Sequence, residues 1–151
     1  MTWLRASFNC ERSCSESSCR LNMGGIRCHV ILKGEKIVSS RNKGDYIIFW
    51  QPDSLTLALI ELKGTPADAS HIEAQLQGCL DKAMDILESF RDGGRPSRLV
   101  PAVLAKGWKT MQLRQLGKRK LSYRGAEYPI GHAKCGCNFD IVCGKWGVDF
   151  R

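Results

Sequence analysis

Two apolar runs around a short polar turn constrain the fold of this chain more than any other feature of its sequence. The runs cover 46–50 and 55–63, and Gln-Pro-Asp-Ser separates them at 51–54. Two β-prone runs joined by so short a turn are typical of an antiparallel hairpin. Pairing counted outward from Trp50 opposite Leu55 sets Asp45 opposite Ile60, beside Glu61 on the second strand.

A long amphipathic segment follows the hairpin. Apolar residues recur at steps of three and four between Ile72 and Phe90, which predicts a helix. Ser70 and Glu73 have the spacing of a capping box at its start. The pair Gly93-Gly94 is the expected stop signal.

Weaker patterns predict the other elements. They are a short helix over 10–21, a strand at 26–32, a turn at 33–36, a short strand at 37–40 and a strand at 98–104. The resulting order is helix, three or four strands, long helix and strand, which predicts an α/β fold.

The hairpin carries a group of residues suited to phosphodiester hydrolysis. Side chains alternate between the faces of a strand, so Glu61 and Lys63 project from the same face. A one-residue bulge or the strand twist would bring Asp45 to that face. Two carboxylates can hold Mg²⁺, which acidifies a water and neutralises phosphate charge. Lys63 can orient or help deprotonate that water and stabilise developing charge.

Asp53 is a rival for the first acid because it follows Pro52 directly. It lies in the turn, eight residues from Glu61. At roughly 3.3 Å per residue it is more than about 20 Å away, so Asp45 is the preferred ligand.

Asp45, then Glu61-Leu62-Lys63 at the end of an apolar strand, then a helix, resembles the PD-(D/E)xK nuclease superfamily. That superfamily includes restriction endonucleases, Holliday-junction resolvases and RecB-like exonucleases. The resemblance covers roughly 25–104. It implies a restriction-endonuclease-like α-β-β-β-α-β core with a mixed central sheet flanked by helices. It also implies Mg²⁺ or Mn²⁺ held by Asp45 and Glu61, with Lys63 assisting the attacking water.

The resemblance suggests further site residues. Gln75, four positions before Cys79, resembles the glutamine of the Gln-x-x-x-Tyr motif of RecB-like nucleases, with cysteine in place of tyrosine. Gln75 could contact the lysine, the water or a phosphate, or be an ordinary helix-surface residue. Members of the superfamily commonly add an acid from the first helix, for which Glu11 and Glu16 are candidates.

Eight cysteines form two clusters and one isolated residue. Because the N-terminus does not resemble a secretion signal, metal is favoured over disulfides. Six of them could hold Zn²⁺ or, by partial resemblance to the C-terminal trio of RecB-like nucleases, a [4Fe–4S] cluster: Cys10, Cys14, Cys19, Cys135, Cys137 and Cys143. His29 and His132 are further candidate ligands. The leading expectation is one metal staple joining the termini; two smaller sites, sites completed by another chain, and free buried thiols are the alternatives.

The charge favours an anionic partner. The net charge is +8 and the pI about 9.2, which favours nucleic acid. The segment 96–126 holds eight Lys or Arg residues, no acid, and two aromatic residues, Trp108 and Tyr123. The residues expected to contact phosphate are Lys106, Lys109, Arg114, Lys118, Arg119 and Lys120. The alternative is a solvated basic face.

Length and hydropathy favour one domain over 1–151, with a core at about 25–104 and a basic, Cys-rich C-terminal extension at 105–151. No apolar run approaches the roughly 20 residues of a membrane helix, and the expected location is the cytoplasm.

The sequence therefore predicts a metal-dependent nuclease that cleaves DNA rather than RNA, with relaxed or structure-directed specificity, and a homodimer or larger assembly is allowed. The alternatives are a non-catalytic nucleic-acid-binding module and a metal-stapled subunit of a larger assembly.

Overall fold

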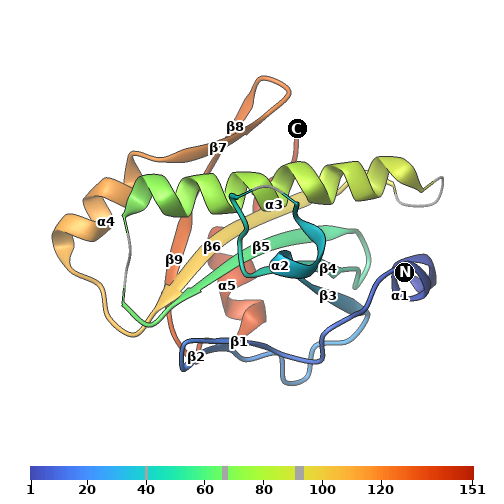
Figure 1. Cartoon of the computed structure of the whole chain (residues 1–151), viewed down its shortest axis with the longest axis horizontal. Helices are drawn as coiled ribbons and strands as arrows, with labels where there is room; N and C mark the ends of the chain where they lie inside the picture. The colour runs from blue at the N-terminus through green and yellow to red at the C-terminus, as the bar shows by residue number, and fades with distance from the viewer. Residues whose placement is uncertain (40, 66–67, 91–93) are drawn as a thin grey trace.

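A mixed six-stranded sheet forms the centre of the protein in the computed structural model, which describes residues 1–39, 41–65, 68–90 and 94–151 (Figure 1). Its strands are β3 (His29–Lys33), β4 (Tyr46–Trp50), β5 (Thr56–Lys63), β6 (Arg98–Ala105), β9 (Gly131–Lys134) and β10 (Val148–Asp149). Strands β3, β4 and β5 are antiparallel neighbours, whereas β6 runs parallel to β5. The other edge of β6 is shared, because β9 pairs in parallel with its end and β10 antiparallel with its start. The predicted α/β class with a mixed central sheet is confirmed.

The predicted hairpin is formed by β4 and β5, but its register differs by one residue from the prediction. Trp50 pairs with Thr56 and Tyr46 pairs with Ile60, so the turn holds the five residues 51–55. The predicted pairing of Asp45 with Ile60 is therefore wrong. Continued by one residue, the observed register sets Asp45 opposite Glu61, and no bulge is needed to bring the two together.

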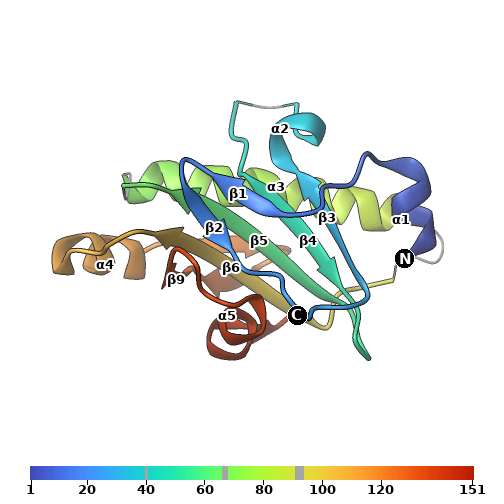
Figure 2. The ribbon, with the colours of Figure 1, turned by 90° about the horizontal axis from the view of Figure 1, so that it is seen from below.

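Two helices cover the two faces of the sheet. Helix α3 (Ala69–Ser89) lies on one face, and α5 (Phe139–Trp146) lies on the other (Figures 1 and 2). Alternation along β5 sends Leu57 and Leu59 into the α3 core, and Ala58 and Ile60 into the α5 core. Each fully buried leucine stabilises such a core by roughly 1.5–3 kcal/mol.

The predicted long helix is confirmed as α3, but its predicted ends are wrong. The N-cap is Asp68, whose carboxylate accepts the Ser70 N–H at 2.8 Å. Ser70 and Glu73 therefore do not form the expected capping box. The helix ends at Ser89, before the predicted stop at Gly93-Gly94, of which Gly93 lies outside the described residues.

The N-terminal segment differs most from the prediction. The expected helix over 10–21 is instead a hairpin of β1 (Cys14–Glu16) and β2 (Cys19–Leu21), preceded by the short helix α1 (Thr2–Ser7). The hairpin lies on the same face of the sheet as α5 (Figure 2). Tyr46 on β4 holds it there, since its hydroxyl donates to the Ser15 carbonyl at 3.0 Å.

The segment 26–40 also differs in detail. The predicted strand at 26–32 begins at His29, and the predicted turn at 33–36 is the helix α2 (Gly34–Ile37). Residues 38 and 39 are not part of a strand, and residue 40 of the predicted strand 37–40 lies outside the described residues. The predicted strand at 98–104 is confirmed as β6.

The C-terminal residues complete the central sheet instead of extending from it. After β6 come α4 (Thr110–Gly117) and a hairpin of β7 (Lys120–Tyr123) and β8 (Ala126–Pro129), which projects past α3 (Figure 1). Strand β9, helix α5 and strand β10 then return to the sheet. None of the described helices has the length and apolarity to cross a bilayer.

Candidate active site

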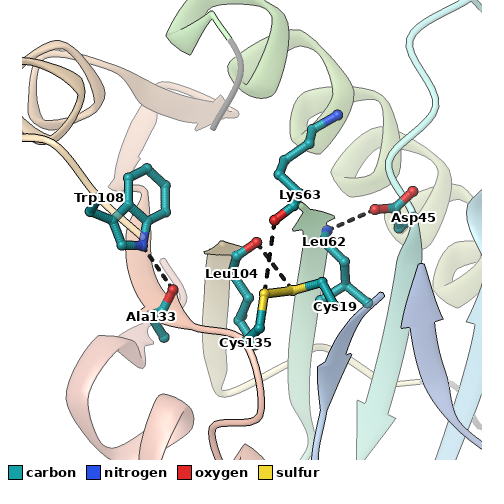
Figure 3. Close-up of a disulfide and its surroundings, with 8 residues drawn as sticks. All are labelled: Cys19, Asp45, Leu62, Lys63, Leu104, Trp108, Ala133 and Cys135. Atoms are coloured by element: carbon teal, nitrogen blue, oxygen red, sulfur yellow. Dashed lines mark hydrogen bonds between the residues drawn. A yellow bond between two sulfur atoms is a disulfide. The ribbon is translucent and has the colours of Figure 1, made fainter. Parts of the chain in front are cut away.

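Asp45 and Glu61 lie side by side at the end of β5 and are held by each other's strand. The Asp45 N–H donates to Glu61 Oε2 at 3.0 Å. The Leu62 N–H donates to Asp45 Oδ2 at 2.7 Å, a contact drawn in Figure 3. These reciprocal hydrogen bonds fix both carboxyl groups relative to the backbone. The hairpin predicted that Asp45 and Glu61 lie together at one end of the sheet, but not these bonds.

Lys63 links this acid pair to helix α3. Its ammonium lies 2.9 Å from Glu61 Oε1 and donates to Gln75 Oε1 at 3.1 Å. Gln75 in turn donates from Nε2 to the Lys43 carbonyl at 3.1 Å. Glu61 and Lys63 are two residues apart on β5 and share the face from which Leu57 and Leu59 pack against α3. Of the contacts considered for Gln75, the one to the lysine is present.

Burial changes the protonation of the acid pair. Glu61 is 1% exposed. Its pKa is raised to about 8, first by this burial and then by the nearby charge of Asp45, against the opposing effect of Lys63. Burial also raises the pKa of Asp45, against the opposing hydrogen bonds from Leu62 and Glu61. Both pKa shifts oppose full ionisation of the pair, whereas the Lys63 ammonium favours it.

The donor set fits a hard divalent cation. Both candidate ligands are carboxylates, and Mg²⁺ typically takes one or two carboxylates and keeps waters or phosphate oxygens for its other positions. Glu61 Oε1 is buried and accepts no well-aligned hydrogen bond, although the Lys63 ammonium is close. Within the described residues, no third His, Cys, Asp or Glu side chain completes a three-ligand group. Water and substrate would have to supply the remaining ligands.

Of the two further acids expected from the sequence, Glu16 is the one whose charge acts on the site. Its negative charge raises the pKa of Asp45, and its carboxylate lies 2.9 Å from the Lys33 ammonium. Glu11 instead pairs with Lys36 at 2.6 Å. Glu16 comes from strand β1, not from the helix that the resemblance implies.

Glycines let the loop before β4 press against α3, a feature that the sequence interpretation missed. A methyl group on Gly44 would lie 2.6 Å from Cys79 Sγ and 3.1 Å from the Gln75 carbonyl. A methyl group on Gly78 would overlap the Asn42 carbonyl. The loop covers Cys79, whose burial raises its pKa to about 12. This close approach places Asp45 beside Glu61. The glycine directly before Asp45 is the sequence signal that could have indicated it.

Asp53 is not part of the site. It is exposed in the turn between β4 and β5, at the opposite end of β5 from Glu61. The literal Pro-Asp string therefore does not mark the acid that meets Glu61.

The six cysteines considered as metal ligands do not converge. Cys19 and Cys135, which are 116 residues apart, form a disulfide with their Cα atoms 5.0 Å apart (Figure 3). Those two sulfurs are therefore not free to bind a metal, and the expected metal staple between the termini is replaced by a covalent one. Across the described part of the chain, no three His, Cys, Asp or Glu side chains form a group that could hold an ion.

The disulfide lies directly below the candidate site. Cys135 Sγ is 3.8 Å from the Lys63 carbonyl oxygen, and Cys19 Sγ is 3.6 Å from that of Leu104. The bond therefore spans the ends of β5 and β6. The remaining cysteines are free, and Cys14, Cys79 and Cys143 among them are buried.

The predicted phosphate-binding residues lie along one path from the end of β6 through α4 to β7. Arg119 is 3.8 Å from Glu73, and Lys120 is 3.8 Å from Glu127. The other four make no ion pair with a described residue: Lys106, Lys109, Arg114 and Lys118. These four are the members of the set with charge free for an external anion.

Comparisons with models of protein families, with curated proteins and with solved structures found no significant match to this chain.

Proposed function

We propose that this protein is a metal-dependent nuclease that hydrolyses phosphodiester bonds, with DNA as its substrate. One observation carries the proposal. At the end of β5, buried Glu61 and half-buried Asp45 each accept a backbone N–H from the other's strand, and the Lys63 ammonium lies 2.9 Å from Glu61. Acids whose pKa values are raised by burial cluster at functional sites, which favours a catalytic role for this pair over a purely structural one.

Asp45 and Glu61 would hold Mg²⁺ or Mn²⁺. Bound there, the ion would supply charge for the phosphate oxygens and acidify the attacking water. If the β1–β2 hairpin and α2 are counted as insertions, the order of elements through β6 matches the one implied by the PD-(D/E)xK resemblance, which supports the proposal but does not carry it.

Lys63 positions a proton and a positive charge in the site. Its ammonium is held between Glu61 and Gln75, so its remaining hydrogen can be donated to the attacking water or to a phosphate oxygen. Gln75 is a positioning residue, because it acts on the reacting atoms through Lys63. Dehydration of the pair strengthens each of these interactions.

The test is a cleavage assay on single-stranded, duplex and branched DNA and on RNA, with Mg²⁺, Mn²⁺ or EDTA. Wild-type protein should cleave only with the cations. Glu61→Gln should lower the rate by on the order of a hundred- to a thousandfold. Asp53→Asn is the matched control, since it changes an exposed carboxylate in the turn that precedes β5, at the end of the strand away from Glu61, and should leave the rate unchanged.

Two outcomes would overturn the proposal. One is binding of nucleic acid without any cation-dependent cleavage, which would favour the non-catalytic binding module. The other is cleavage that survives equally in Glu61→Gln protein prepared in parallel, which would mean that the activity comes from elsewhere.

A further inference from the structure

A groove of about 910 Å³ runs along the free edge of β9, between α4 and α5. No other described strand pairs with that edge. Three aromatic rings line the groove, from Trp108, His132 and Trp146, together with the lysines Lys134 and Lys145. No Asp or Glu is among its lining residues. The surface is therefore both aromatic and positively charged.

The rings form a row that is fixed to the backbone of β9. The His132 ring centroid lies 5.7 Å from that of Trp108 and 4.9 Å from that of Trp146. The Trp108 indole N–H donates to the Ala133 carbonyl at 2.9 Å, and that of Trp146 donates to the His132 carbonyl at 2.8 Å (Figure 3 shows the former). Both indoles are half-buried. Their polar atoms are satisfied by the protein, so what they offer a ligand is ring surface.

The charge of the groove comes from its lysines. Lys134 and Lys145 are exposed and make no ion pair with any described residue. The Lys145 ammonium lies 5.5 Å from the centre of the Trp146 ring. Burial, together with the charge of Lys145, lowers the pKa of His132, so this ring adds an aromatic surface and no charge at neutral pH. Planar rings beside free ammonium groups complement a ligand with planar bases and phosphates.

The groove reaches the same edge of the sheet as the candidate active site, although α5 lines it on the face opposite to the one from which Glu61 and Lys63 project. Lys63, Ala105 and Lys134 are register partners on three neighbouring parallel strands, so their ends share one edge of the sheet. Two strand spacings amount to about 10 Å, which is on the order of three nucleotides at the rise of a stacked strand. Cys135 lines the groove, and its sulfur is 3.8 Å from the Lys63 carbonyl. In Figure 3, Trp108 and Asp45 lie on opposite sides of Lys63.

We propose that this groove stacks unpaired bases of a single-stranded segment of nucleic acid and thereby presents the adjoining phosphodiester to Asp45, Glu61 and Lys63. The inference rests on the proposed function for its second part only. A single strand is the fitting occupant because its bases have exposed faces, whereas the bases of a duplex are stacked on one another. The enzyme would then act on single strands, or on duplexes with an unpaired end or bubble.

The groove can be tested by measuring the binding of nucleic acid under conditions in which no cleavage occurs. The probe is a fluorescein-labelled oligothymidine and a blunt duplex of the same length, titrated with Glu61→Gln protein in EDTA and followed by anisotropy. The single strand should bind more tightly than the duplex. Trp108→Leu and Trp146→Leu in this background should each weaken single-strand binding by on the order of tenfold, with little change for the duplex. Trp3→Leu is the matched control, because Trp3 packs on Phe90 away from the groove, and it should change neither affinity.

Charge variants keep the test valid if a tryptophan variant does not fold. Lys145→Glu reverses an exposed charge in the groove, and Arg27→Glu reverses an exposed charge beside β3 at the other side of the sheet. Only Lys145→Glu should weaken single-strand binding by more than severalfold. Equal binding of single strand and duplex, or equal effects of groove and control variants, would overturn the inference.

The two proposals fail in different ways. If the groove variants lose single-strand binding but no protein cleaves with Mg²⁺ or Mn²⁺, the groove is a binding site and the nuclease proposal is wrong. If wild-type protein cleaves and the Trp108→Leu and Lys145→Glu proteins bind and cleave single strands equally well, the nuclease proposal stands and the groove inference is wrong.

Discussion

Two regions share the edge of the sheet where β5, β6 and β9 end, and they differ in their exposure to water. At β5, Glu61 is 1% exposed and each carboxyl group is tied to the neighbouring strand. In the groove beside β9, Trp108 and Trp146 are half-buried and Lys134 is exposed. Dehydration strengthens charge interactions, whereas open ring surfaces can accept a ligand. The difference fits a division between a region for chemistry and a region for binding.

The disulfide lies between the two regions and belongs to neither. Cys135 lines the groove, yet its sulfur touches the backbone of Lys63. Some substitutions should therefore affect only one of the two regions, whereas loss of the disulfide should destabilise both.

Removing the disulfide should weaken the whole fold. A double Cys19→Ala, Cys135→Ala variant should lose about 2–4 kcal/mol of unfolding free energy, because the bond closes a loop of more than a hundred residues in the unfolded chain. Urea denaturation measures the loss. A reductant should destabilise the wild type by a similar amount and add nothing to the double variant; a wild type that is indifferent to reductant would contradict the prediction.

A methyl group on Gly44 should disturb the candidate active site and leave the groove unchanged. Gly44→Ala sets a Cβ against Cys79 and the Gln75 carbonyl, so the loop and Asp45 must shift. A displacement of about 1 Å costs on the order of a hundredfold in rate. Cleavage rate and single-strand affinity should be measured together, and only the rate should fall. Gly144→Ala, whose added methyl would meet nothing within 4 Å, is the control and should leave both unchanged.

Metal affinity should depend on pH through Glu61. Its pKa is about 8 in the folded protein, so below that pH a bound cation must displace a proton. The affinity for Mg²⁺ should therefore rise with pH by up to about tenfold per unit between pH 6 and 8 and level off above. Calorimetric titrations in buffers of different ionisation heat would also detect the released proton. Glu61→Gln should bind weakly with no such slope, and a flat wild-type profile would argue against Glu61 as a ligand.

Free and paired basic residues should contribute unequally to phosphate binding. Lys106 and Lys109 make no ion pair with a described residue, whereas Arg119 and Lys120 lie near acids. Replacing the first pair with alanine should lower the slope of log affinity against log salt by roughly two, and replacing the second pair by less. Binding titrations from low to moderate salt give both slopes. Equal losses would mean that these surface pairs break on binding.

The residues of the candidate active site could be predicted because the patterns that indicate them lie within one short stretch of sequence. Alternation along 46–50 and 55–63 determines which side chains share a face, and this brought Glu61 and Lys63 together. The exact register could not be read from the turn, because a five-residue loop and a four-residue loop have similar Pro-Asp-Ser compositions. The capping residue was missed because Asp68 and Ser70 both favour that position.

The groove could not be predicted because its residues come from segments that are far apart in the chain. Trp108 follows β6, His132 lies on β9 and Trp146 ends α5, and no periodicity relates their positions. The β1–β2 hairpin was missed for a different reason. Its turn residues Ser17 and Ser18 have φ values of 48° and 60°, a conformation usually indicated by Gly or Asn.

The outer edge of β6 is covered by two separate strands, and this matters when the C-terminal residues are truncated or fused to another protein. That edge is closed by two short strands, β9 and β10, which are joined through α5. If the residues from Val148 onward detach, the backbone groups of Arg98 and Leu99 lose their partners on that side. An open edge next to the most apolar strands of the sheet is a template for pairing with another copy. Val148 and Asp149 thus cover part of a strand edge that could otherwise pair with another copy, and a clip or fusion there should be tested for aggregation as well as for activity.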